Sequence, residues 1–114
     1  MTSRFEKIWQ DKLRAKQLSV SKALEEIKGL ESELPRGVRI IIYGSAARGE
    51  VGLHSDVDIL VDAPTPMEAM PILDGVGSIL SRHGIPMDGR WIGYAADRLL
   101  EMSKQDWIVV EKRE

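Results

Sequence analysis

Two aspartates separated by one residue, Asp56 and Asp58, are the part of this sequence best suited to chemistry. They begin a segment in which Val57, Ile59 and Val61 take every second position, a pattern that predicts a β-strand. Because strand side chains alternate between the two faces, both carboxylates should lie on one face, about 7 Å apart. Their repulsion at that distance is roughly 2 kcal/mol at an effective dielectric constant of about 20. A bound cation would remove this cost.

A ligand set made of carboxylate oxygens favours Mg²⁺ or Mn²⁺ over zinc. Mg²⁺ usually takes one or two carboxylates and completes its coordination with phosphate oxygens and water. A source of phosphate ligands is suggested by Gly44 and Ser45, which follow a run of β-branched residues. Gly44 lets the backbone approach a ligand closely. Backbone N–H groups at the start of a short helix, together with the Ser45 hydroxyl, would face an anion.

Two further side chains are candidates for this site. Arg48 is placed to clamp a phosphate tail, although an ordinary surface arginine is an equally good interpretation. Two-metal phosphoryl transfer needs a metal on the attacking oxygen as well as on the leaving group, and a third carboxylate can accept the proton of the nucleophile. Asp88 is the only acidic residue of the third predicted strand. It would face the aspartate pair if that strand neighbours the second, and would otherwise face solvent.

The N-terminal segment, residues 1–34, should be helical. Apolar residues recur there at alternating spacings of four and three, forming one stripe interrupted by Lys16. Ser19 or Ser21 could cap a second helix and so divide the segment. The stripe either packs on the domain or contacts a partner or second copy, and packing is the commoner use of such a helix.

The remaining elements alternate between strands and helices. Strands are predicted at 38–43, 56–62, 85–92 and 107–110. A helix should begin with Thr65 as its cap, Pro66 at its first position and Glu68 at its third, and should end near Gly84. Pro71 implies a kink or a later start, and a further short helix is expected over 97–104. This order predicts an α+β fold, in which a small mixed sheet has helices packed on one side.

Bulk composition bounds the class of protein. The chain has 114 residues, 43% hydrophobic and 30% charged, which suits one domain. We expect an N-terminal helical segment, 1–34, and a catalytic core, 38–110. The net charge of −2 gives no strong nucleic-acid signal, and the absence of cysteine excludes disulfides and zinc–thiolate sites. No apolar run suggests a membrane span or a signal peptide, so a cytoplasmic protein is expected.

The stretch GSAARGEVGLHSDVDILV, from Gly44 to Val61, resembles the signature of the DNA polymerase β-like nucleotidyltransferase superfamily. It is most similar to the minimal nucleotidyltransferase (MNT) domain proteins of bacteria and archaea. Gly44, Ser45, Asp56 and Asp58 fall on the Gly-Ser and Asp-x-Asp core of that signature, and Arg48 falls on a frequent Ala-Arg-Gly. The resemblance implies a polymerase β palm-like fold. It also implies transfer of a nucleoside monophosphate from an NTP, with ATP expected, to a hydroxyl group.

The resemblance further implies a role for each residue. Gly44 and Ser45 would hold the triphosphate, Asp56 and Asp58 would bind two Mg²⁺ ions, and Asp88 would be the third carboxylate. The family usually continues with apolar residues after that third position, where this chain has Gly89 and Arg90.

Partners are also implied. Minimal members often pair with a separately encoded helical HEPN protein, in some cases as an antitoxin that adenylylates its partner toxin. The resemblance therefore implies a HEPN-type partner, a homo-oligomer, or both. Two alternatives remain. One is a nucleotidyltransferase-fold binding module that scaffolds or neutralises a partner without turnover. The other is a small-molecule, antibiotic-modifying enzyme, which the short chain disfavours.

Overall fold

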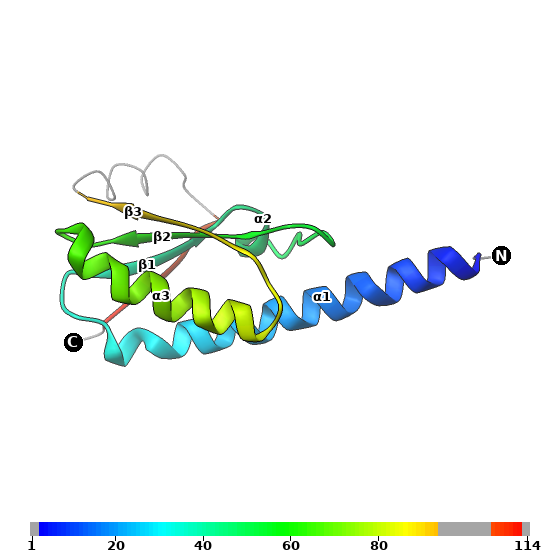
Figure 1. Cartoon of the computed structure of the whole chain (residues 1–114), viewed down its shortest axis with the longest axis horizontal. Coiled ribbons are helices and arrows are strands. Elements are labelled where there is room, and N and C mark those ends of the chain that lie inside the picture. The colour runs from blue at the N-terminus through cyan, green and yellow to red at the C-terminus, as the bar shows by residue number, and fades with distance from the viewer. Residues whose placement is uncertain (1–2, 94–105, 113–114) are drawn as a thin grey trace.

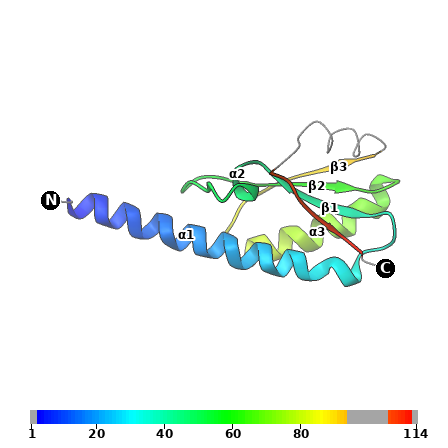
Figure 2. The same cartoon turned by 180° about the vertical axis from the view of Figure 1, so that it is seen from behind.

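A four-stranded mixed sheet with two long helices on one side forms the body of the protein (Figures 1 and 2). The computed structural model describes residues 3–93 and 106–112. The strands lie in the order β3-β2-β1-β4, and β1 is antiparallel to both of its neighbours, whereas β2 and β3 are parallel. The predicted fold class is thereby confirmed. The strands are β1 (Arg39–Tyr43), β2 (Val57–Asp62), β3 (Met87–Ile92) and β4 (Ile108–Glu111).

The hydrophobic core lies between the sheet and the helices α1 (Arg4–Lys28) and α3 (Pro66–Arg82). The alternation seen in the sequence of β2 appears directly as burial: Val57, Ile59 and Val61 are fully buried, and the residues between them are half-buried. Full burial of such a side chain stabilises the fold by about 1.5–3 kcal/mol. The same alternation leaves Asp58 on the opposite face of the sheet, away from the core.

Helix α1 is continuous, so the predicted division at Ser19 or Ser21 is wrong. Burial of Val20 and Ala23 holds the segment helical through the serines, because tertiary packing outweighs the preference of serine for caps. The helix begins instead with a capping box at Ser3, in which the Glu6 backbone N–H donates to Ser3 Oγ at 3.1 Å. A short 3₁₀ helix, η1 (Gly29–Glu33), continues the chain toward the sheet.

The apolar stripe of α1 has two different environments. Its C-terminal half packs on the core through Val20, Ala23, Leu24 and Ile27, as the packing interpretation predicts. Its N-terminal half extends beyond the sheet (Figure 1), in a molecule that measures 54 × 29 × 24 Å. Phe5 is 83% exposed there. The packing interpretation therefore holds for only half of this helix.

Helix α3 starts where its cap predicts. Thr65 Oγ1 accepts the backbone N–H of Glu68 at 3.3 Å, and Pro66 occupies the first turn. Pro71 lies inside the helix, so the later start considered for it is wrong. Its position on the exposed side leaves water able to hydrate the carbonyl that its missing N–H would have bonded. The helix ends before Gly84, whose φ of 70° gives the left-handed residue expected after a helix.

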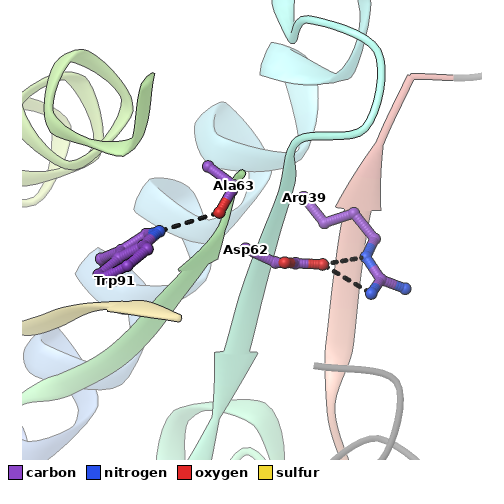
Figure 3. A network of polar contacts seen from close by, with 4 residues as sticks. All are labelled: Arg39, Asp62, Ala63 and Trp91. Atoms are coloured by element: carbon purple, nitrogen blue, oxygen red, sulfur yellow. Dashed lines mark hydrogen bonds and ion pairs between the residues drawn. The ribbon is translucent and has the colours of Figure 1, made fainter. Parts of the chain in front are cut away.

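Polar contacts fix the strand register at the end of the sheet remote from Gly44 (Figure 3). Arg39 donates to Asp62 Oδ2 through Nε at 2.9 Å and through a terminal nitrogen at 2.6 Å, which ties β1 to β2. Trp91 Nε1 donates to the Ala63 carbonyl at 2.9 Å, which ties β3 to the end of β2. A slip of one residue would break both contacts and turn the buried side chains outward.

Candidate active site

Gly44 is the residue on which the turn after β1 depends. Its φ is 71°, and the four-residue helix α2 (Gly44–Ala47) begins there. A Cβ at this position would collide with Oδ2 of Asp58 and lie 3.4 Å from its Cγ. Glycine is therefore needed twice, for the positive φ and for the close approach of the carboxylate. The Gly-Ser turn and the second aspartate, distant in the sequence, are in contact.

Asp58 and Asp88 lie side by side. The parallel pairing of β2 with β3 sets Asp58 opposite Asp88, and the antiparallel pairing with β1 sets Asp58 opposite Tyr43. Paired residues share a face of the sheet, so one face carries the row Tyr43, Asp58, Asp88. The expectation that Asp88 faces the pair depends on its strand neighbouring the second, and the structure places it there. Its role as the third carboxylate remains a prediction.

Asp56 lies immediately before the first residue of β2. The preceding turn is closed by Ser55, whose Oγ accepts the Gly52 N–H at 2.9 Å and whose own N–H donates to the Gly52 carbonyl. The Asp56 side chain is exposed. It is thus available to a ligand that arrives from solvent, whereas Asp58 is half-buried.

The electrostatics of the face favour a cation. Burial raises the pKa of Asp58, and the neighbouring charges of Asp88 and Asp56 raise it further, against an opposing effect of Arg90. Burial also raises the pKa of Tyr43, to which Asp58 and Asp88 add in the same direction. Carboxylates that disfavour their own ionisation gain most from a bound positive charge.

Two arginines border the site, and both have acidic partners. Arg48 Nε lies 3.1 Å from Glu50 Oε2 on the exposed loop. Arg90 Nε lies 3.5 Å from Asp88 Oδ1 on the site face. Arg48 would have to exchange Glu50 for a phosphate in order to act as a clamp, and that role stays a prediction. Sequence reasoning noted Arg90 only as a departure from the family pattern, without placing it beside the carboxylates.

Gly89 has a structural explanation. Gly89 follows Asp88 in β3, so it points to the opposite face of the sheet, toward α3. A Cβ added there would lie 2.8 Å from Met87 Cε and 3.0 Å from Leu73 Cδ2. Glycine therefore lets β3 pack closely under α3, while Asp88 and Arg90 point to the other face.

Tyr43 also lies on the face that carries Asp58 and Asp88, and the sequence did not single it out. The antiparallel pairing of its strand with the strand of Asp58 was the signal that could have placed it there.

No ready-made metal cluster of three acidic, histidine or cysteine side chains occurs among residues 3–93 and 106–112. The acidic groups nonetheless suit a divalent cation by their chemistry, since they offer oxygen ligands and burial raises the pKa of Asp58. Asp56 and Asp58, with Asp88 once Arg90 releases it, would hold such an ion together with phosphate oxygens and water.

Comparison with known families identifies the family of the domain. The model of the nucleotidyltransferase domain matches residues 20–88, more than half of the chain. The chain belongs to the nucleotidyltransferase domain family. Every candidate residue of the site lies inside the match, which ends at Asp88. The match begins at Val20, which is also the first buried residue of α1.

A solved structure is also similar to this nucleotidyltransferase domain. It is a protein from Sulfolobus solfataricus that is provisionally described as a nucleotidyltransferase. The two chains share 23% identity with a TM-score of 0.42, over 90% of this chain and 88% of the other. Among curated proteins, none matches. Within the part of the domain that the structure describes, no helix has the length and apolar character needed to cross a membrane.

Proposed function

We propose that this nucleotidyltransferase domain transfers a nucleoside monophosphate, with AMP expected, from an NTP to a hydroxyl group of an acceptor. The observation that supports the proposal most is the contact of Asp58 with both Gly44 and the neighbouring strand position of Asp88. It brings the candidate phosphate-binding turn and the candidate metal ligands into one place. A purely structural role does not account for this grouping, because adjacent carboxylates repel each other.

The reaction would be an in-line displacement. The acceptor oxygen forms a bond to the α-phosphorus, the bond from that phosphorus to the bridging oxygen breaks, and pyrophosphate leaves. Backbone N–H groups at Ser45 and Ala46 would hold the triphosphate, and Asp88 would take the hydroxyl proton. Two Mg²⁺ ions, when bound by Asp56, Asp58 and Asp88, supply neutralisation of charge at the attacking and leaving oxygens.

The acceptor in this proposal is a partner protein. A cavity of about 370 Å³ is lined by Arg39 and Asp62, at the end of β1 remote from Gly44, so it offers no small-molecule acceptor site beside the carboxylates. A small helical protein of the HEPN type, modified on a hydroxyl side chain as in toxin–antitoxin pairs, is the partner that the family resemblance favours.

Labelling tests the proposal. Protein incubated with ATP labelled in the α-phosphate, Mg²⁺ and the candidate helical partner should yield a labelled partner band and free pyrophosphate. Asp56→Asn should abolish the band, whereas Asp11→Asn, on the exposed part of α1, should not. Label that persists in Asp56→Asn would contradict this site.

A binding module without turnover is the second candidate. The ion pair of Arg90 with Asp88 favours it, since a cation already partly satisfies the would-be third carboxylate. In that case the partner would bind with equal affinity to the wild type and to Asp56→Asn, and no NTP would label it.

A further inference from the structure

The N-terminal half of α1 is an exposed apolar and basic arm. We define the arm as residues 3–17, which lie outside the nucleotidyltransferase match. Phe5 is 83% exposed and Trp9 is 54% exposed. The spacing from Phe5 to Trp9, Lys12 and Lys16 places these four side chains on one face of the helix. This face continues the stripe that packs on the core further along, so it has the character of a contact surface.

The arm is positively charged. It carries five basic residues against Glu6 and Asp11 as its only acidic ones, in a chain whose net charge is −2. Pairing two arms would therefore bring like charges together, at a cost. A suitable occupant of this face must be apolar and acidic.

Such a surface exists at the other end of the same molecule. A groove of about 150 Å³ runs between η1 and the first half of α3, and we call it the acidic groove. Leu30, Leu34 and Ile72 contribute apolar lining. Gly75 also lines the groove. A Cβ added there would meet nothing within 4 Å, so a partner side chain can approach this part of the groove. Met67, 83% exposed, extends the apolar surface along α3.

The charge around the groove is complementary to the arm. Residues 30–34 and 66–80, the two segments that form it, contain no basic residue and four acidic ones: Glu31, Glu33, Glu68 and Asp74. Glu33 lines the groove itself. Asp74 lies three residues after Pro71 on α3, and so on the same helix face as this lining residue.

The arm cannot fill the groove of its own chain. Figure 1 shows the N-terminus and the η1 end of α1 at opposite ends of the molecule, separated by the length of a continuous helix. We propose that the arm of one copy docks in the acidic groove of a second copy, and that the second arm returns the contact. In an antiparallel arrangement with two-fold symmetry, the arm of each copy lies in the acidic groove of the other. This dimer does not depend on the proposed transferase activity.

Charge reversal tests the proposal. Sedimentation velocity should show a concentration-dependent dimer that weakens with added salt. The arm variant Arg4→Glu/Lys12→Glu and the groove variant Glu33→Lys/Asp74→Lys should each dissociate about tenfold or more readily, because like charges then meet. All four positions are exposed, so folding should be preserved.

Mixing the two variants separates this dimer from any other. In a mixed pair, one contact joins a reversed arm to a reversed groove, and the other joins a wild-type arm to a wild-type groove. Both contacts are then complementary in charge, so a heterodimer should form where neither variant associates alone. Leu18→Ser is the matched control, since this 57% exposed side chain of α1 is in neither surface. It should leave the dimer unchanged. A wild-type monomer at all concentrations, a dimer that survives both reversals, or a mixture without heterodimers would overturn the proposal.

The cysteine-free sequence permits a second readout. Lys12→Cys in the arm and Gly75→Cys in the groove would be the only thiols in their respective chains. Oxidation of an equimolar mixture should give a disulfide-linked heterodimer in preference to either homodimer. Equal yields of all three species would contradict arm-in-groove docking.

Discussion

The Asp58 carboxylate occupies the space that a side chain at Gly44 would need. This contact links the turn after β1 to the second aspartate of β2, and it makes the geometry of the candidate phosphate-binding turn depend on a candidate metal ligand. Substitutions at either residue should therefore alter both stability and nucleotide binding.

Gly44→Ala should be more destabilising than Gly49→Ala. Both glycines have a positive φ, 71° and 72°, so both substitutions incur a backbone strain of about 1–2 kcal/mol. Only at Gly44 does the new Cβ also displace Asp58, whereas nothing lies within 4 Å of it at Gly49. Urea denaturation should show an excess loss of about 1 kcal/mol or more for Gly44→Ala. Equal losses for the two variants would show that the contact has no energetic weight.

Asp58→Asn should flatten the acid side of the stability profile. A raised carboxyl pKa means that the folded protein holds this proton more tightly than the unfolded chain does. The contribution is complete below the ordinary Asp pKa of about 4 and is lost as pH rises through the folded value. Between about pH 3.5 and about pH 7, the melting temperature should therefore fall less with rising pH in Asp58→Asn than in the wild type. Asp11→Asn should follow the wild type.

Mg²⁺ with ATP should raise the melting temperature of the wild type. At about 100 times the Kd, binding adds about 2.7 kcal/mol to the free energy of unfolding. Asp58→Asn should abolish the shift, because a neutral amide removes one ligand charge from the metal. A shift of unchanged size in this variant would refute the assignment of Asp58 as a metal ligand.

Arg90→Gln should strengthen Mg²⁺ binding to the nucleotide-free protein. Arg90 competes for Asp88 at 3.5 Å, and an exposed pair of this kind contributes up to about 1 kcal/mol, or roughly fivefold in Kd. Calorimetric titration with Mg²⁺ would measure the change, with Arg14→Gln on the arm as the control. Weaker binding in Arg90→Gln would mean that Arg90 supports the metal site instead of competing with it.

Glu26→Gln should loosen the attachment of α1 to α3 near neutral pH. Glu26 contacts His83 Nε2 at 2.7 Å and Arg82 at 3.2 Å, and the His83 hydrogen bond is the main cause of its lowered pKa. A lowered carboxyl pKa contributes stability above the unfolded value, which is lost as pH falls through the folded value. The melting temperature of the variant should therefore lie below that of the wild type at about pH 6, and the two should converge at about pH 3.

Glu25→Gln is the matched control for that experiment. Glu25 pairs with Lys28 one turn along α1, so its replacement should change the melting temperature little at either pH. An equal effect of the two substitutions would indicate a general charge effect on α1, without a specific link to α3.

Local patterns predicted the elements that carry the site. The β-branched run before Gly44 and the alternation after Asp56 became β1 and β2 within one residue of the predicted bounds. Thr65 and Gly84 marked the ends of α3 because caps and left-handed residues are local chemistry. The predicted helix over 97–104 lies outside the described residues.

Relations between distant residues were harder to predict. The register that sets Asp58 opposite Asp88 depends on how α3 returns the chain to the sheet, which no local pattern encodes. The continuity of α1 through Ser19 depended on burial of its neighbours. The two environments of its apolar stripe depended on where the sheet ends. Periodicity identifies a contact face but not the surface that it meets.

The parallel pairing of β2 with β3 has a consequence for how this family can change. The turn after α3, residues 83–86, determines which side chain of β3 stands beside Asp58. One inserted residue there would bring Met87 to that position and direct Asp88 toward the core. The length of this turn, which lies outside the Gly44–Asp58 segment in the sequence, therefore decides whether β3 places a carboxylate beside Asp58 at all.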